Sequence, residues 1–408
     1  MADIVFAFDP AIDRPIPIPD AAPATIAAGM AAAPMEALRA AVTTARDADA
    51  AAMVLFGRVL DPHRASPAQA AAVRNLILEL AADGCHTVWV TDDSDDCTAI
   101  AQMLGDPRGL LFATPANPVR LDIRGLPVEI VRAHGGIAAT SHAATLPTSP
   151  DPLEHRVIVG WDRSFWSAER WDDALATDSP QSLAGWAQPG CHCVWGSRRG
   201  HSLPGGIRHV PPLQPRSIHE ATSGGCILLS LINLDDEIDA AGGSGRWRTA
   251  ATHRVSWKTI TVESAAGGDE ELATTIWSAL ESLPTDPQSP LHIIRCSVEC
   301  GASVARRVRV AEIAAETLAR VRDLFDKKNV RAWCEELYAD PGESLAPLGH
   351  ARSGGRPGST TSFSSALADI VVGIENETLA AQRRGGLAMP ADMAREAGWL
   401  ALELIESA

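Results

Sequence analysis

The 408-residue sequence contains no apolar run near the roughly 20 residues that span a bilayer, and its N-terminus lacks the pattern of a secretory signal. It also contains no Walker A loop with its lysine, and no GxGxxG turn that follows a strand. These absences argue against a membrane protein and against an enzyme that uses a nucleotide cofactor. We therefore expect a cytoplasmic protein.

Positive charge is also scarce. Lys and Arg total 35 against 51 Asp and Glu, which gives a net charge of −16. Such a chain has no overall basic field to attract nucleic acid, so any contact with DNA must be local. The concentrated basic groups are Arg198-Arg199 and residues 306–309. A solvated surface is the more common meaning of such groups, and phosphate binding is the alternative.

The eight cysteines do not form a zinc motif. Cys191-His192-Cys193 is tighter than a CxxC knuckle, and Cys296 and Cys300 have no partner pair at zinc-finger spacing. We interpret them as structural thiols in a reducing compartment.

The first third of the chain alternates strands and helices. The apolar segments IVFAF, AMVLF and HTVWV predict strands, and residues 34–49 predict a helix with Pro34 in its first turn. A second helix should begin after Ser66 as N-cap, with Pro67 in its first turn, and end at Gly84. This order, with strands that do not alternate in polarity, predicts a parallel sheet buried on both faces and ligand chemistry at the carboxyl ends of its strands.

Polar motifs follow these strands. IVFAF leads into Asp9, Ala11 and Asp13; AMVLF leads into Gly57-Arg58; and HTVWV leads into a loop that contains Asp93-Ser94-Asp95. Farther along, RVIVGW ends without a metal-binding side chain. CHCVWGSRR then carries Ser197 and Arg199, and LQPRSIHEATSGGCILLSL predicts a returning strand.

In order and spacing, these segments resemble the calcineurin-like metallophosphoesterases, specifically the SbcD-type DNA repair exonuclease subunits. The resemblance covers Ile4 to Glu263. It implies an α/β (α+β) fold, with a four-layer metallophosphoesterase-like β-sandwich flanked by helices over residues 1–263. A smaller α/β capping domain would occupy residues 264–350, and a flexible linker with C-terminal helices would occupy residues 351–408.

The resemblance also implies a two-metal hydrolytic site from which most ligands are missing. Such a site activates water between two cations held by carboxylates, an amide and imidazoles. By position, Asp9 matches the family's aspartate, Ala11 a histidine, Arg58 the bridging aspartate, Asp93 the asparagine, Ser94 the catalytic histidine, and Ser197 and Arg199 two further histidines. No catalytic residue is therefore intact, and Asp9 and Asp93 are the remaining candidate metal ligands. We expect no resident cofactor, with Mn²⁺ or Mg²⁺ as the cofactor of an active protein.

Three hypotheses follow. The first is a pseudoenzyme that acts as a scaffold or regulatory subunit in DNA processing. The second is an active metal-dependent phosphoesterase or nuclease with an altered, carboxylate-rich site. The third is a module on the same fold that binds a protein or ligand unrelated to DNA. Under the first, Arg58 should point into the vacated metal site and pair with Asp9, Asp93 or Asp95.

The resemblance also suggests partners. In SbcD-type proteins the C-terminal tail engages an SbcC-like ATPase, and helices predicted at residues 366–379 and 391–405 would do so here. The alternative is that their apolar stripe packs on the chain's own capping domain. DNA and a second copy of the chain are the other candidate partners.

Overall fold

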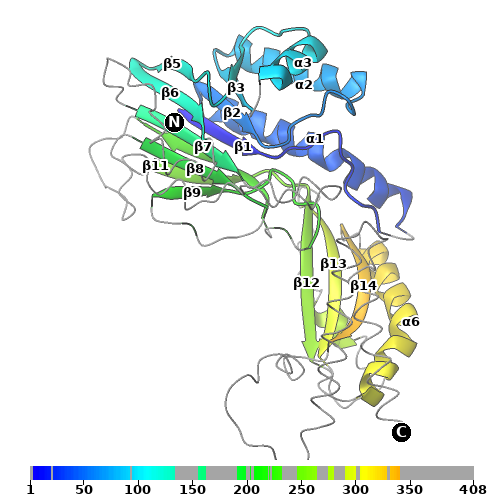
Figure 1. Cartoon of the computed structure of the whole chain (residues 1–408). Coiled ribbons are helices and arrows are strands. Elements are labelled where there is room, and N and C mark those ends of the chain that lie inside the picture. Colours follow the sequence, from blue (N-terminus) through cyan, green and yellow to red (C-terminus); the bar gives the residue numbers. More distant parts are fainter. Residues whose placement is uncertain are drawn as a thin grey trace, which may run out of the picture.

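The structure is a computed structural model. It describes residues 3–19, 22–91, 94–133, 155–161, 191–198, 203, 206–218, 220, 223–231, 246–263, 274–279, 290–299, 304–328 and 331–340. Within these residues the protein is a mixed α/β structure in which the strands form three sheets (Figure 1).

The largest sheet has six strands in the order β11-β10-β1-β2-β3-β4. Its strands are β1 (Ile4–Phe8), β2 (Ala52–Phe56), β3 (His86–Val90), β4 (Leu110–Ala113), β10 (Gly225–Ser230) and β11 (Arg246–Ala251). Strands β1 to β4 are parallel, whereas β10 runs antiparallel to β1 and β11 antiparallel to β10. The prediction that AMVLF and HTVWV lie in one parallel sheet is therefore confirmed.

Three helices pack on one face of this sheet: α1 (Ala24–Asp47), α2 (Pro67–Ala82) and α3 (Ser94–Leu104). The sequence signals around α2 are confirmed. Ser66 and Gln69 form a capping box, in which the Ser66 hydroxyl accepts from the Gln69 backbone N–H and the Gln69 side chain accepts from the Ser66 backbone N–H. Gly84 follows the helix with φ 81, a left-handed conformation that favours glycine.

Helix α1 differs from its prediction, because it begins ten residues earlier than Pro34 and carries that proline in its interior. The added turns have their own packing partner. Met30 and Ala33 are buried in a cluster with Val255 and Leu291 of a different sheet. Burial of this Ala-rich segment against two sheets outweighs the hydrogen bond that Pro34 removes.

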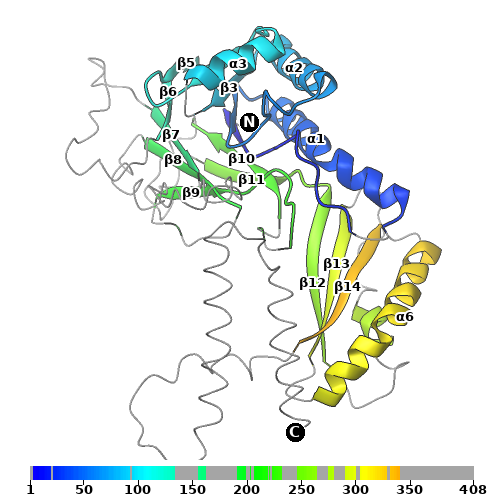
Figure 2. The ribbon, with the colours of Figure 1, turned by 45° about the vertical axis from the view of Figure 1, so that its right-hand side comes forward.

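The five-stranded sheet has the order β5-β6-β7-β8-β9. Its strands are β5 (Val119–Ile123), β6 (Leu126–Arg132), β7 (His155–Trp161), β8 (Cys191–Gly196) and β9 (Ile207–Val210). One hydrophobic cluster joins it to the six-stranded sheet and contains Phe8, Phe56 and Trp161 among its buried side chains. Figure 2 shows the six-stranded sheet with helices α1 to α3 on one side and the five-stranded sheet on the other.

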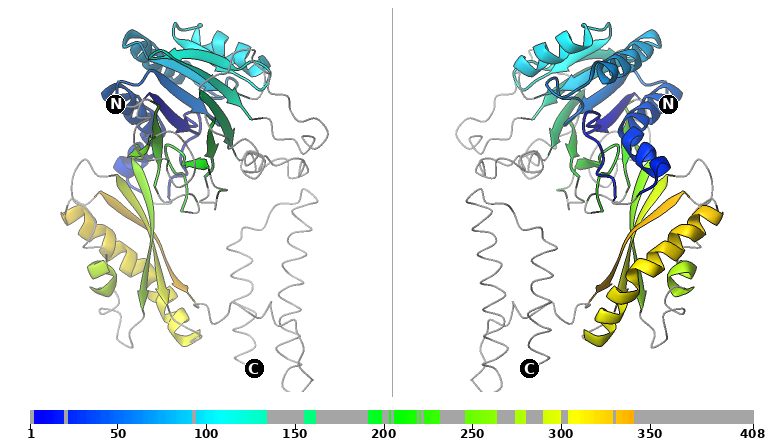
Figure 3. Two further views of the ribbon diagram at one scale, coloured as in Figure 1. Left: turned by 90° about the vertical axis from the view of Figure 1, so that its left-hand side faces the viewer. Right: turned by 90° about the vertical axis from the view of Figure 1, so that its right-hand side faces the viewer.

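The third sheet consists of β12 (Val255–Glu263), β13 (Leu291–Glu299) and β14 (Ala332–Asp340), all parallel. Helix α6 (Val304–Lys328) connects β13 to β14 and buries Val310, Val321 and Phe325 against the sheet (Figure 3). Residues 274–279, before β13, are also helical. Because β12 pairs with β13, the change of sheet falls between β11 and β12, before the domain boundary predicted at residue 263.

The predicted linker and C-terminal helices at 351–408 lie outside the described residues. Among the helices that the structure does describe, none combines the length and the apolar character that a bilayer span requires.

Candidate functional site: an arginine and carboxylate cluster

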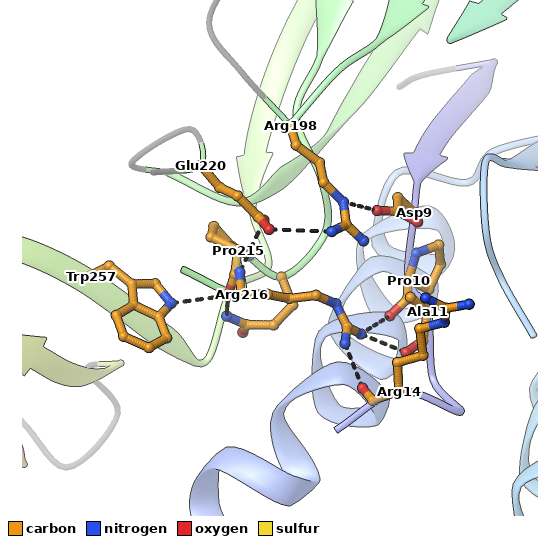
Figure 4. Close-up of polar contacts among 10 residues, drawn as sticks. Asp9, Pro10, Ala11, Arg14, Arg198, Pro215, Arg216, Glu220 and Trp257 are labelled. Carbon is orange, nitrogen blue, oxygen red and sulfur yellow. Dashed lines mark hydrogen bonds and ion pairs between the residues drawn. The ribbon is translucent and has the colours of Figure 1, made fainter. Parts of the chain in front are cut away.

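The candidate site gathers where three strands end. Asp9 directly follows β1, Arg58 follows β2 one residue after Gly57, and Arg198 follows β8 one residue after Ser197. Strands β1 and β2 are parallel neighbours, so their carboxyl ends meet at one edge of the six-stranded sheet. The packing of the two large sheets brings the end of β8 to the same place, and Figure 4 shows Arg198 directed at Asp9.

The backbone of the loop after β1 is strained and held on several sides. Asp9 and Ala11 have backbone φ angles of 50° and 44°, which residues other than glycine rarely adopt. The N–H groups of Asp9 and Ala11 donate to the carbonyls of Phe56 (2.9 Å) and Arg58 (2.8 Å). These bonds tie the loop after β1 to the turn after β2, so the position of Asp9 is fixed by its neighbours.

Arg216 holds the same loop from a distant part of the chain. Its Nη1 donates to the carbonyl of Arg14 (2.5 Å), and its Nη2 donates to the carbonyls of Ala11 (2.5 Å) and Pro10 (3.2 Å) (Figure 4). Burial lowers the pKa of Arg216, the Asp9 carboxylate opposes this, and the Arg198 guanidinium lowers it further. The planar guanidinium is suited to this task because it presents several donors in a rigid fork.

Asp9 is buried and forms its ion pair with Arg198. The Nε of Arg198 donates to Oδ2 of Asp9, and Nη1 donates to Oε1 of Glu220 (3.3 Å). Burial alone would lower the pKa of Arg198, but the carboxylates of Asp9 and Glu220 outweigh it and leave the pKa raised. Burial raises the pKa of Glu220 against the opposing effect of Arg198. Glu220 also accepts from the Arg216 backbone N–H (3.0 Å), so both arginines are tied to one acid.

Arg58 lies within electrostatic range of this ion pair. Its pKa falls to about 10, first because of burial; Asp9 opposes the shift, and the guanidiniums of Arg14 and Arg198 add to it. In the structure Asp9 forms an ion pair with Arg198. From the sequence, Arg198 is identified only as part of the basic group Arg198-Arg199. That Arg58 itself pairs with Asp9, Asp93 or Asp95 stays a prediction.

Of the remaining predicted site residues, the structure describes Ser197 and Ser94. Ser197 is buried, and its backbone N–H donates to Val210 (3.3 Å) while its carbonyl accepts from Nε2 of His209 (3.0 Å). Ser94 is the first residue of α3. Asp93 and Arg199 lie outside the described residues.

The donors that the structure describes in this cluster do not fit a divalent cation. Asp9, Asp13 and Glu220 are interleaved with guanidinium groups, which stay protonated and repel a cation at close range. One oxygen of Asp9 is already bound by Arg198. In the part of the chain that the structure describes, no group of three or more His, Cys, Asp or Glu side chains is arranged to hold a metal.

Several polar atoms in the cluster are buried without a hydrogen-bond partner among the described residues. They are two acceptors, Asp9 Oδ1 and Asp13 Oδ2, and three donors, Arg14 Nε, Arg198 Nη2 and Arg216 Nε. Such atoms are rare in folded proteins, because a buried polar group without a partner loses its hydrogen bonds to water and forms none in the protein. The cluster therefore holds unused hydrogen-bonding capacity.

Sequence reasoning missed Arg198, Arg216 and Glu220 as parts of one site. Arg216 and Glu220 lie in the LQPRSIHEA segment, whose pattern predicts a returning strand and contributes to the family resemblance but does not indicate a role for either side chain. No protein-family model matches the chain, and a search of curated proteins found no match. The family resemblance therefore depends on the order of the motifs alone.

Proposed function

We propose that this chain is a noncatalytic relative of the SbcD-type metallophosphoesterases that acts as a scaffold or regulatory subunit in DNA processing. The observation that carries the proposal is the ion pair between Asp9 and Arg198. Asp9 follows the first strand, where the resemblance places a metal ligand, and its carboxylate is neutralised by a side chain of the same protein.

The order of the elements supports the family assignment. The parallel strands β1, β2 and β3 alternate with α1 and α2, and β10 returns antiparallel beside β1. The proposal includes the finer architecture, a four-layer sandwich in which the two large sheets form the inner layers. The shared cluster around Phe8 and Phe56 favours it.

Charge explains why such a site would be inert. A two-metal site places several positive charges next to the substrate phosphate and needs carboxylates and imidazoles around them. Here Arg58 and Arg198 supply fixed positive charge at the strand ends, and Ala11 and Ser197 supply no imidazole. An arginine can orient a phosphate, but it cannot lower the pKa of a bound water as a metal does.

The proposed partner is an SbcC-like ATPase, engaged by the helices predicted at residues 366–379 and 391–405. DNA would be contacted locally or through the partner, because the net charge of −16 opposes a general attraction to nucleic acid. A homodimer is the other assembly that the resemblance allows.

The proposal is tested by turnover. Purified full-length protein is assayed with Mn²⁺ and with Mg²⁺ on a phosphodiester substrate and on linear DNA, beside Asp9→Ala and Arg58→Asp. We expect no turnover above background for any of the three proteins. Arg58→Asp restores one carboxylate, but Ala11, Ser94, Ser197 and Arg199 still leave the site short of imidazoles. Metal-dependent turnover that Asp9→Ala abolishes would overturn the proposal.

A further inference from the structure

Two buried thiols meet in the three-stranded sheet. Cys296 lies on β13 and Cys334 on β14, and their sulfur atoms are 3.5 Å apart, in hydrogen-bonding contact. Both residues are fully buried and belong to the apolar cluster between this sheet and α6. A free cysteine in such a place ordinarily packs as a small apolar residue. This pair differs because each sulfur contacts another sulfur.

The pairing of the two strands brings the sulfurs together. Strands β13 and β14 are parallel neighbours whose register shifts between Ile294 and Arg295. Cys334 therefore lies opposite Ile294, and Cys296 lies opposite Leu337, so the thiols meet diagonally across the strand pair. A covalent bond between them requires the sulfurs to approach from 3.5 Å to about 2.0 Å.

Arg322 of α6 holds the backbone beside Cys334. Its Nε donates to the carbonyl of Cys334 (3.0 Å), and its Nη2 donates to the carbonyl of Glu335 (3.3 Å). Its guanidinium also lies over the ring of Trp333, 4.1 Å from the centroid. The strand is thus fixed on both sides of Cys334, and the sulfur contact depends on the helix as well as on the sheet.

The contact makes the two thiols chemically unequal. The pKa of the Cys296 thiol is lowered because the S–H of Cys334 donates to its sulfur, although burial acts in the opposite direction. The same bond, and then burial, raises the pKa of the Cys334 thiol. Because the thiolate is the form that attacks an oxidant, Cys296 is the nucleophile of the pair and Cys334 the thiol beside it that can complete a disulfide.

We propose that Cys296 and Cys334 form a reversible disulfide in the presence of hydrogen peroxide, and that this bond locks β14 to β13. The Cys296 thiolate attacks one peroxide oxygen, the O–O bond breaks, and a sulfenic acid forms while hydroxide leaves and is protonated to water. The Cys334 thiol then loses its proton and attacks the sulfenic sulfur, so that the S–S bond forms and a second water leaves. Two thiols are oxidised, and the peroxide is reduced by two electrons.

The bond would act on the edge of the sheet. In the described part of the chain, β14 is an edge strand whose one neighbour is β13, and α6 is the connection between them (Figure 3). Cys296 and Cys334 are 38 positions apart, so the bond closes a loop that contains all of α6. A cross-link of this kind restricts local opening. The reduced protein therefore keeps an edge strand that can detach, and the oxidised protein does not.

Burial determines how oxidation begins. Neither sulfur is exposed, so an oxidant reaches the pair only while the sheet edge is briefly open, and hydrogen peroxide is small enough to enter then. The proposal is independent of the proposed function, because none of its residues belongs to the cluster around Asp9.

The test is a map of the cysteines in the full-length protein. Reduced protein is treated with hydrogen peroxide, the remaining thiols are alkylated, and the digested protein is measured by mass spectrometry. Wild type, Cys296→Ala, Cys334→Ala and Cys85→Ala are compared. Cys85 is the matched control, because it is also a buried thiol, and the contact described for its sulfur is the carbonyl of His86 (3.8 Å). Thermal melting confirms that the variants fold.

We expect a linked peptide that joins Cys296 to Cys334, that dithiothreitol releases, and that persists in Cys85→Ala. In Cys334→Ala, oxidation should stop at a sulfenic acid on Cys296, which dimedone traps. Amide hydrogen exchange in α6 and β14 should slow by roughly tenfold or more on oxidation of wild type, while exchange in β1 to β3 stays unchanged.

Several outcomes would overturn the proposal. They are the absence of the linked peptide, its formation only in denaturant, equal oxidation of Cys85, and unchanged exchange in β14 after oxidation. Fragmentation between Cys296 and Cys300 shows which of the two is linked, and a bond from Cys300 would also overturn it. If a variant does not fold, the map of wild type decides alone, because it requires no substitution.

Discussion

Arg198 and Asp9 form a buried ion pair between residues 189 positions apart. Arg198 extends from the end of β8 in the five-stranded sheet, and Asp9 follows β1 in the six-stranded sheet. The pair therefore bridges the two sheets at the edge where their strand ends meet. It also explains how a strained loop retains a buried carboxylate, since the guanidinium supplies the compensating charge.

Removal of either partner should be costly. We expect Arg198→Ala to lower the free energy of unfolding by about 3 to 5 kcal/mol, because it leaves the buried Asp9 carboxylate without its ion-pair partner. Asp9→Ala should lower it by less, because Arg198 keeps its ion pair with Glu220. The double variant should lose less than the sum of the two single losses. Urea unfolding of the four proteins measures this coupling, and strictly additive losses would contradict the ion pair.

Arg216 should prove structural, and lysine should not replace it. Arg216→Lys keeps the charge but loses the fork that reaches the carbonyls of Pro10, Ala11 and Arg14. We expect it to lower the free energy of unfolding by about 2 kcal/mol, since hydrogen bonds from charged donors contribute about 1.5 to 3 kcal/mol each.

Arg39→Lys is the control for Arg216→Lys, because Arg39 is exposed and contacts only one acid on its own helix among the contacts described for it. The same urea titration should leave Arg39→Lys within about 0.5 kcal/mol of wild type. Equal stability of the two variants would mean that Arg216 does not hold the loop.

Much of the fold could be predicted because its signals are local. The capping box at Ser66, the left-handed Gly84 and the apolar runs of β1, β2 and β3 lie within a few residues of the elements that they define. The start of α1 could not be predicted, because the partners that bury Met30 and Ala33 lie more than two hundred residues away in β12 and β13.

The candidate site was predictable only in part for the same reason. Asp9 and Arg58 follow strands that the sequence identifies, so their shared edge was foreseeable. The place of Arg198 was not foreseeable, because it depends on the exact end of β8 and on how the two sheets pack.

Close packing between the two large sheets gives a third prediction. A Cβ added to Gly196, at the end of β8, would lie 2.3 Å from Cδ2 of Phe8 and 2.7 Å from Cε2 of Phe56. We expect Gly196→Ala to lower the free energy of unfolding by about 1 to 3 kcal/mol, because overpacking moves both rings. Urea unfolding of wild type and Gly196→Ala measures this difference in the free energy of unfolding.

Gly29→Ala is the matched control for Gly196→Ala. Among the described residues, its added Cβ would meet Leu291 alone, at 3.7 Å, which is an ordinary contact. Within helix α1 alanine is preferred over glycine by roughly 0.5 to 1 kcal/mol, so this variant should be neutral or slightly stabilised. If Gly196→Ala is equally well tolerated, the two sheets do not approach as closely as the structure indicates.

The last prediction concerns two buried histidines in the five-stranded sheet. Nδ1 of His155 lies 3.2 Å from Nε2 of His192, and the rings are stacked. One ring must donate and the other accept, so the pair is stable only while at least one ring is neutral. Burial, and then the charge of His155, lowers the pKa of His192 to about 4. Burial also lowers the pKa of His292, in β13, to about 4.

These pKa shifts determine whether stability rises or falls with pH. An unfolded histidine takes up a proton near pH 6.5, whereas folded His192 does so only near pH 4, so the unfolded state binds more protons between these values. Stability should therefore fall as the pH drops from about 6.5 to about 4, by up to about 3 kcal/mol from His192 alone. Urea unfolding at several pH values measures the slope. His192→Gln should reduce the slope to the part that His292 contributes, while His86→Gln, a change at an exposed position, should leave it as in wild type. A slope that His192→Gln does not change would show that the pair does not resist protonation in the folded protein.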